Sequence, residues 1–190
     1  MDKVKQGVKA QKGYTCEACG KPIEPGTLYQ WKKGFRGPKA TRHDTCPSWS
    51  QSERTSGPLA DAYAAQENAH SALDEMELVK YMTDPTDFST VDFGDVVGDV
   101  RSILEECANE AEPAKDGTQE SFDNMPEGLQ QGDTGQMLEE RIDMLESWMD
   151  TLTEWSAPAD EPEEHTEEAV EEWYEELIND ARGVIDELEA

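Results

Sequence analysis

The sequence contains no long apolar run: none of its segments approaches the roughly twenty apolar residues of a membrane-spanning helix. Residues 1–12 are basic and polar, without the apolar stretch of a secretory signal peptide. We therefore expect no membrane contact and a cytoplasmic location. Cysteine is scarce as well. Cys107 lies far from the other three cysteines, in a segment with a helical pattern of apolar residues. A free thiol in a reducing compartment is the simplest account of it.

Basic residues are nearly missing from most of the chain. Residues 59–190 contain 5 Lys or Arg and 39 Asp or Glu, a net charge of −34. Residues 1–58 contain 11 basic and 5 acidic residues, a net charge of +6. This difference predicts two surfaces with different partners. The basic segment could attract phosphate, whereas the acidic remainder should repel nucleic acid and anionic membranes.

Patterns typical of enzyme sites are absent too. The sequence shows no nucleophile beside a base, no phosphate-binding loop and no carboxylate pair that stands out from the many acidic residues. His70 and His165 are isolated, and we expect surface or interhelical positions for both. We expect no enzymatic activity.

Four residues form the clearest motif: Cys16, Cys19, His43 and Cys46 follow the order Cys-x2-Cys, then 23 residues, then His-x2-Cys. Two close pairs joined by a loop-rich segment are typical of a tetrahedral structural zinc site. Unmetallated thiols or a redox pair are the alternatives, and four protein ligands would leave no open position for catalysis. We predict that residues 14–50 fold around Zn²⁺, which should supply about 10 kcal/mol or more of folding energy.

A family resemblance rests on these ligands and two neighbouring runs. The ligand pattern, with Lys-Pro-Ile at residues 21–23 and Pro-Gly-Thr-Leu-Tyr at residues 25–29, resembles the zinc finger of the poly(ADP-ribose) polymerase type. Fingers of this type commonly recognise DNA ends or breaks, so the resemblance implies the four ligand roles and contact with DNA. It covers about a fifth of the chain, and no segment resembles a polymerase domain.

The rest of this segment suggests how it could meet nucleic acid. Residues 1–13 are predicted to be a basic arm, either solvated and disordered or ordered on a nucleic-acid backbone. Residues 27–31 read as a strand, with Leu28, Trp31 and Phe35 as a miniature core. The predicted nucleic-acid contacts are Lys32, Lys33, Arg36, Lys39 and Arg42.

Residues 57–112 are predicted to form two helices. The first would begin at a Ser56 cap and continue as an alanine-rich stripe until Asp84, before Pro85. The second would begin after Ser89 or Thr90 and stop at Pro113. Residues 113–133 lose the helical period and are predicted to be a linker.

Residues 134–190 are predicted to form an acidic helical hairpin. Apolar residues recur at alternating spacings of three and four, as in a coiled-coil seam, at Leu138, Ile142, Leu145, Met149 and Leu152. Trp148 and Trp155 lie beside this seam, where they either widen the core or form an anchor patch for a protein partner. The acidic face of the last helix is either a solvated surface or a mimic of a nucleic-acid backbone.

Residues 121–130, Ser-Phe-Asp-Asn-Met-Pro-Glu-Gly-Leu-Gln, resemble a recurring segment of uncharacterised bacteriophage proteins. The resemblance implies a phage source, a location in the host cytoplasm and a role in host or genome handling.

The predicted fold class is therefore α+β: a small treble-clef-like zinc finger followed by a mostly α-helical bundle or coiled-coil body. Our first hypothesis is a non-enzymatic zinc-binding protein whose basic segment contacts nucleic acid and whose acidic helices contact protein. The alternative is a protein-interaction or inhibitor protein, acidic and DNA-mimicking, in which zinc is purely structural. The sequence leaves the oligomeric state open.

Overall fold

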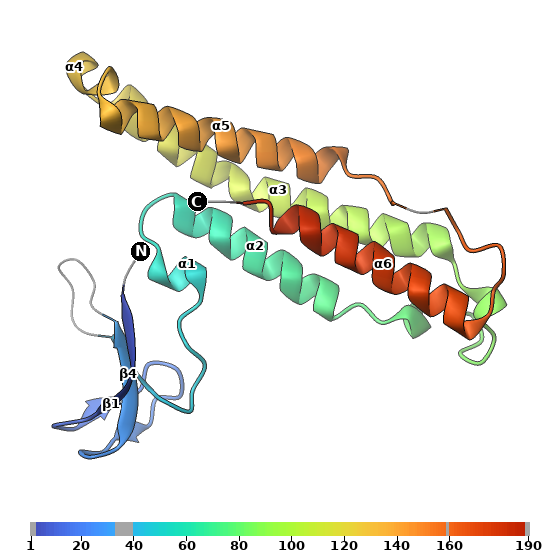
Figure 1. The fold of residues 1–190 in the computed structure, drawn as a ribbon, viewed down its shortest axis with the longest axis horizontal. Helices are drawn as coiled ribbons and strands as arrows, with labels where there is room; N and C mark the ends of the chain where they lie inside the picture. The colour runs from blue at the N-terminus through green and yellow to red at the C-terminus, as the bar shows by residue number, and fades with distance from the viewer. Residues whose placement is uncertain (1–2, 33–39, 159, 189–190) are drawn as a thin grey trace. The chain divides into compact units, whose positions relative to one another are not determined.

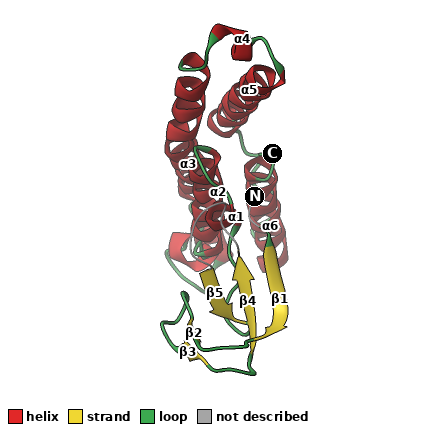
Figure 2. Cartoon of the chain, turned by 90° about the vertical axis from the view of Figure 1, so that its left-hand side faces the viewer, coloured by secondary structure: helices red, strands yellow, loops and turns green. Residues whose placement is uncertain are grey.

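The computed structural model describes residues 3–32, 40–158 and 160–188, and the chain divides into two compact units. The first, Met1–Ser56, is called the head, and the second, Gly57–Ala190, is called the body. All strands longer than an isolated bridge lie in the described part of the head, and the long helices lie in the body (Figure 2). The predicted α+β class is confirmed.

The head contains two small antiparallel sheets. Strands β1 (Val4–Lys9), β4 (Leu28–Lys32) and β5 (Ala40–His43) form one sheet in the order β1-β4-β5. Strands β2 (Tyr14–Thr15) and β3 (Pro22–Ile23) form the other. A short helix, α1 (Gln51–Arg54), follows, with Ser50 and Glu53 forming a capping box.

The prediction of a disordered arm is wrong for β1, because this segment has a partner far along the sequence. Lys5 pairs with Trp31 and Val8 with Tyr29, and the register shifts between these pairs. Gly7, at φ 66°, accommodates the shift, and its N–H donates to Asp44 Oδ1 at 2.8 Å. The N-terminal strand is thereby tied to the loop that carries the second ligand pair.

The miniature core differs from the prediction. Tyr29 and Ile23 are buried with Ala10 and Cys16, and Trp31 packs partly buried against them. Leu28 is 49% exposed and lies on the face of β4 opposite Tyr29, at the beginning of the strand. Phe35 lies outside the described residues.

Four long helices dominate the described part of the body: α2 (Leu59–Asp74), α3 (Phe93–Asp123), α5 (Asp133–Glu154) and α6 (Glu167–Ile185). Helices α2 and α5 both pack along α3, and α6 covers α2, α3 and α5 (Figure 1). Successive long helices run in opposite directions, and their apolar stripes meet in one continuous core. Within the described residues, no helix combines the length and the apolarity needed to cross a bilayer.

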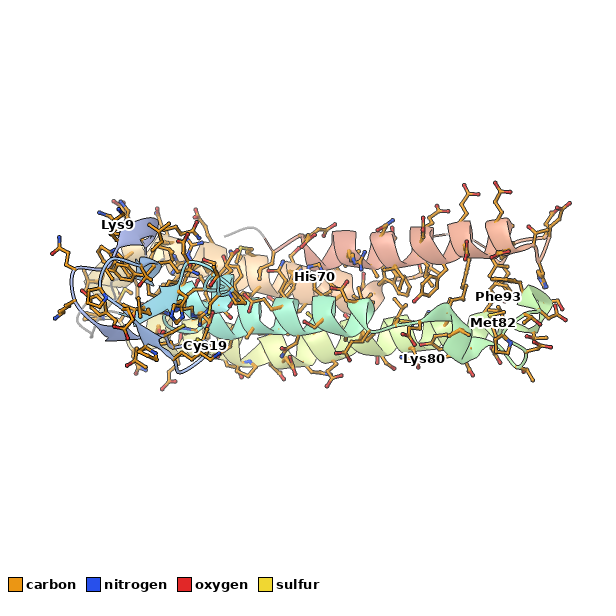
Figure 3. All side chains as sticks on the ribbon, turned by 90° about the horizontal axis from the view of Figure 1, so that it is seen from below. Lys9, Cys19, His70, Lys80, Met82 and Phe93 are labelled. Carbon is orange, nitrogen blue, oxygen red and sulfur yellow. The ribbon has the colours of Figure 1, made fainter. Side chains whose placement is uncertain are left out.

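The boundaries of the first two body helices differ from the prediction. Helix α2 starts at Leu59, after Pro58 at the N-cap position rather than a Ser56 cap, and ends at Asp74, well before Pro85. Two 3-10 turns, η1 (Leu78–Tyr81) and η2 (Phe88–Thr90), fill the gap, and Met82 lies at the same end of the body as Phe93 (Figure 3). Asp92, rather than Ser89 or Thr90, caps α3 by accepting the Asp95 N–H.

Helix α3 continues through Pro113 to Asp123, so the prediction that a linker begins at this proline is wrong. The proline nitrogen cannot bond to the carbonyl of Asn109. Both residues are exposed, so water can satisfy that carbonyl. Ala114 and Thr118 extend the buried stripe beyond the proline, and α4 (Glu127–Gln130) forms a short turn before α5.

Trp148 within α5 and Trp155 directly after its end belong to the core. Trp148 is 3% and Trp155 is 7% exposed. Their indole N–H groups donate to Val184 O at 3.2 Å and to Asp180 Oδ2 at 2.7 Å. The prediction of an anchor patch is therefore wrong, because both rings are already packed against α6. They widen the core, which was the other interpretation.

Candidate metal centre

The four predicted ligands lie together in the head, and their donor atoms are all within 4.8 Å of one another. Cys16 Sγ and Cys46 Sγ are 3.8 Å apart, and His43 Nδ1 lies 3.4 Å from Cys19 Sγ and 3.9 Å from Cys46 Sγ. A tetrahedral site with Zn–S of about 2.3 Å and Zn–N of about 2.0 Å has S–S edges of about 3.8 Å and S–N edges of about 3.5 Å. The cluster thus has the dimensions of a site that could hold a metal ion.

The first ligand pair is held by a tight turn. The Gly20 N–H donates to Cys16 O at 2.9 Å, and the Cys16 N–H donates to Lys21 O at 2.9 Å. Gly20 adopts φ 69°, a left-handed conformation that glycine takes without a steric penalty. Cys16 is buried, whereas Cys19 lies on the surface and is labelled in Figure 3.

The second pair comes from the end of β5 and the turn after it. His43 Nδ1 faces the sulfurs, and Nε2 donates to Pro22 O at 3.1 Å. A backbone carbonyl at this nitrogen fixes the tautomer that leaves Nδ1 free to bind a metal. The two pairs are also linked directly, because the His43 N–H donates to Cys16 Sγ at 3.4 Å.

The Gln30 side chain stabilises the turn that carries this second ligand pair. Its side chain is 2% exposed on the face of β4 opposite Tyr29, and its Nε2 donates to Cys46 O at 2.8 Å and to His43 O at 3.2 Å. The sequence reasoning missed this residue. The signal in the sequence was a single amide side chain between two aromatic residues, Tyr29 and Trp31, in a predicted strand. Because side chains alternate between the two faces of a strand, this amide lies on the face opposite both rings.

The thiols differ in their readiness to ionise. Although burial opposes ionisation of Cys16, hydrogen bonds from the backbone N–H groups of His43 and Cys19 lower its thiol pKa to about 6. Desolvation and the neighbouring Cys16 sulfur raise the pKa of Cys46 to about 11. One thiolate therefore forms readily, and a bound cation would stabilise the others by supplying the positive charge that the cluster lacks.

Of the predicted nucleic-acid contacts, Arg42 is engaged within the head. Its side chain is 11% exposed, forms an ion pair with Glu53 and donates to Ser48 O at 3.1 Å. Its guanidinium carbon lies 4.8 Å from the centroid of the Trp49 ring. This environment contradicts the prediction for Arg42, because its donors are directed to the fold rather than to solvent.

Lys32 is half-buried, and its Nζ donates to Glu53 O at 2.7 Å. The other three predicted contacts lie outside the described residues: Lys33, Arg36 and Lys39. Basic side chains are instead exposed along β1 and the turns near the first ligand pair, with Lys9 labelled in Figure 3. The exposed set is Lys3, Lys5, Lys9, Lys12 and Lys21.

No family model matches the chain, and comparisons with curated proteins and with solved structures find no significant match. The resemblance to a poly(ADP-ribose) polymerase zinc finger therefore rests on the ligand order and the two short runs alone.

Proposed function

We propose that the head binds a structural Zn²⁺ through Cys16, Cys19, His43 and Cys46, and that the chain is a non-enzymatic protein joining nucleic acid to a protein partner. The observation that carries the metal assignment is that the four donor atoms lie within 4.8 Å of one another, and that three of the distances, 3.4 to 3.9 Å, match the edges of a tetrahedral zinc site. Three sulfurs and one imidazole are soft donors, which favour Zn²⁺ over the oxygen-seeking Ca²⁺ and Mg²⁺.

The contact with nucleic acid is supported by charge. The head carries +6, and five of its lysines are exposed in the described residues. Zinc would act indirectly, by stabilising the strand β1 and the turns that carry these lysines. Phosphate attraction of this kind weakens steeply with salt.

Zinc should be tested first, on the full chain. We expect one zinc per chain by elemental analysis, and a Co²⁺-substituted protein with the intense visible bands of tetrahedral thiolate coordination. Cys46→Ser should lose the metal, whereas Cys107→Ser should keep it. A wild-type protein that binds no metal after reconstitution would overturn the assignment.

Binding to nucleic acid should be tested on the zinc-loaded chain by fluorescence anisotropy, with labelled single-stranded, double-stranded and nicked DNA and with RNA. We expect affinity for at least one of these, decreasing log-linearly with salt concentration. If none of them binds at low salt, the role in nucleic-acid contact is wrong even if zinc is present.

A second candidate function, the mimicry of DNA by the body, is favoured by a regular feature of α6. Exposed glutamate pairs recur every four residues at 167–168, 171–172 and 175–176, and none of these carboxylates pairs with a described cation. With a rise of about 1.5 Å per residue, α6 presents about one charge per 3 Å, close to the roughly 3.4 Å spacing of charges along one DNA strand. The partner would then be the basic surface of a DNA-binding protein.

This candidate predicts competition. An immobilised chain should capture purified DNA-binding proteins, and duplex DNA should displace them. Replacing the four glutamates at 168, 171, 172 and 175 by glutamine should abolish capture. Capture that survives both treatments would contradict mimicry. A phage source, implied by residues 121–130, would place such a partner in the bacterial host.

A further inference from the structure

One face of the three-stranded head sheet, together with Tyr14 of β2, carries aromatic rings next to lysines. Tyr14 stacks on Tyr29 with ring centroids 5.2 Å apart and an interplanar angle of 17°. Lys5 Nζ lies 5.5 Å from the centroid of the Trp31 ring, and Lys12 Nζ lies 5.6 Å from that of Tyr14. We call these five residues the aromatic–lysine strip.

The strip is continuous because of how β1 and β4 pair. Lys5 lies opposite Trp31. Tyr29 precedes Trp31 by two positions in β4, so both side chains lie on the same face of the strand. Tyr29 is buried, whereas Tyr14 and Trp31 are half-buried and pack against the same small core. Two partly accessible rings are thus anchored on a buried third ring.

The lysines mark one side of each ring. Lys5 and Lys12 are exposed, and their ammonium groups lie over the rings of Trp31 and Tyr14, which are themselves half-buried. A nucleobase could replace each ammonium group over its ring, and the displaced lysine, on a flexible stem, could then reach a neighbouring phosphate.

Aromatic rings beside cations distinguish between forms of nucleic acid. In a continuous duplex the base faces are already stacked on one another, so half-buried rings on a sheet gain little from it. In a single strand the faces are free, and stacking on an aromatic side chain is tolerant of sequence. Lysines alone would fit either form.

We propose that the aromatic–lysine strip binds single-stranded nucleic acid, with bases stacked on Trp31 and Tyr14 and phosphates held by Lys5 and Lys12. This inference rests on the proposed contact with nucleic acid and specifies its form and its place. The metal ligands take no part in the contact; they hold the sheet.

The test uses the zinc-loaded full chain and four labelled probes: a 12-nucleotide oligo(dT), an oligo(U) of the same length, a blunt duplex and a nicked duplex. We expect the single strands to bind at least about tenfold more tightly than either duplex. Trp31→Ala should weaken binding of the single strands by about tenfold or more, the loss that one stacked base accounts for. The double variant Lys5→Gln/Lys12→Gln should weaken binding and reduce the salt dependence.

Two controls separate recognition from folding. Each variant should retain one Co²⁺ with an unchanged visible spectrum, which shows that the head remains folded. Lys80→Gln and Lys115→Gln remove charges from the body and should leave binding unchanged. Tryptophan fluorescence gives an independent readout, since quenching by oligo(dT) should be reduced in Trp31→Phe.

The outcomes distinguish this inference from the proposed function. Binding that favours a duplex, or a folded Trp31→Ala variant with wild-type affinity for single strands, would overturn the strip while leaving the nucleic-acid role intact. Absence of binding to all four probes would overturn both.

Discussion

Gln30 contacts no metal-binding atom, yet its amide holds the loop that carries two ligands. With its donor removed, the carbonyl groups of His43 and Cys46 would lose their buried partner, and the loop would be free to move away from Cys16 and Cys19. We predict that Gln30→Ala weakens zinc affinity by about 10- to 100-fold, the range typical of residues that support metal ligands. Competition with a chromophoric chelator measures this loss.

The matched control is Gln51→Ala, at an exposed position of α1 whose backbone carbonyl accepts hydrogen bonds from the N–H and the hydroxyl of Thr55 and is retained in the variant. Its zinc affinity should equal that of the wild type. Equal affinities for Gln30→Ala and the wild type would show that the ligand loop is rigid without the amide.

Cys107 should behave differently from the three ligand cysteines. It is 2% exposed in the core of the body, and burial, with a smaller contribution from Glu110, raises its thiol pKa to about 12. We predict that a chelator makes three thiols reactive toward Ellman's reagent at neutral pH, while the fourth reacts only after denaturation. Assignment by mass spectrometry of the modified peptides checks which thiol is protected. Rapid labelling of Cys107 in the chelated, folded protein would contradict the prediction.

At the scale of elements, the junction between α4 and α5 depends on a glycine. A Cβ at Gly135 would lie 1.8 Å from Gln130 O, which is a backbone atom and cannot move alone. We predict that Gly135→Ala destabilises the body by about 1–3 kcal/mol in spite of the better helix propensity of alanine. At Gly183, within α6, such a Cβ would meet no described atom within 4 Å apart from its own helix and chain neighbours, so Gly183→Ala should stabilise the body by about 0.5–1 kcal/mol.

Chemical denaturation followed by circular dichroism at 222 nm measures both variants. If both variants were more stable than the wild type, helix propensity alone, rather than the close approach at Gln130, would determine the effect.

The sequence predicted those features that depend on local spacing. The ligand set Cys16, Cys19, His43 and Cys46 was recognisable because each pair lies within one turn. The long helices were recognisable because apolar residues recur with a period near 3.6. Strand β1 was missed because its partner β4 is about twenty residues away, and its short alternation of valine and lysine resembles a polar arm.

Other errors arose where tertiary packing overrides a local rule. Pro113 normally stops a helix, but the buried stripe continues at Ala114 and Thr118 and outweighs the lost hydrogen bond. The guanidinium group of Arg42 is a common ligand of phosphate, but within the head it stacks on Trp49 and forms an ion pair with Glu53. Neither outcome can be read from one segment, because each depends on a partner supplied by the fold.

At the scale of the whole molecule, charge distinguishes the two units. The body carries −34 with 5 basic residues, and few of its carboxylates form ion pairs with described residues. Its stability must therefore overcome repulsion between like charges, which salt screens over a Debye length of about 10 Å at 0.1 M and about 3 Å at 1 M. The core of the head is separate and includes Cys16 and Cys46, two of the metal ligands.

We predict that the two units respond to different conditions. Raising NaCl from about 20 mM to about 500 mM should raise the melting temperature of the body by several degrees, because the Debye length falls from about 20 Å to about 4 Å and repulsion between all but the nearest carboxylates is screened. A chelator should abolish the transition of the head and leave that of the body in place. Calorimetry on the full chain measures both transitions.

A charge variant tests the cause of the salt effect. Glu172→Lys places a cation one helical turn from Glu168 and from Glu176 on α6, where it replaces two repulsive pairs by two attractive ones. The variant should melt at a higher temperature than the wild type at low salt and show a smaller salt response. Glu172→Gln, which removes the charge without reversing it, should lie between the two. A body whose melting temperature is the same in all three proteins and at both salt concentrations would mean that its carboxylates are too well solvated for their repulsion to affect folding.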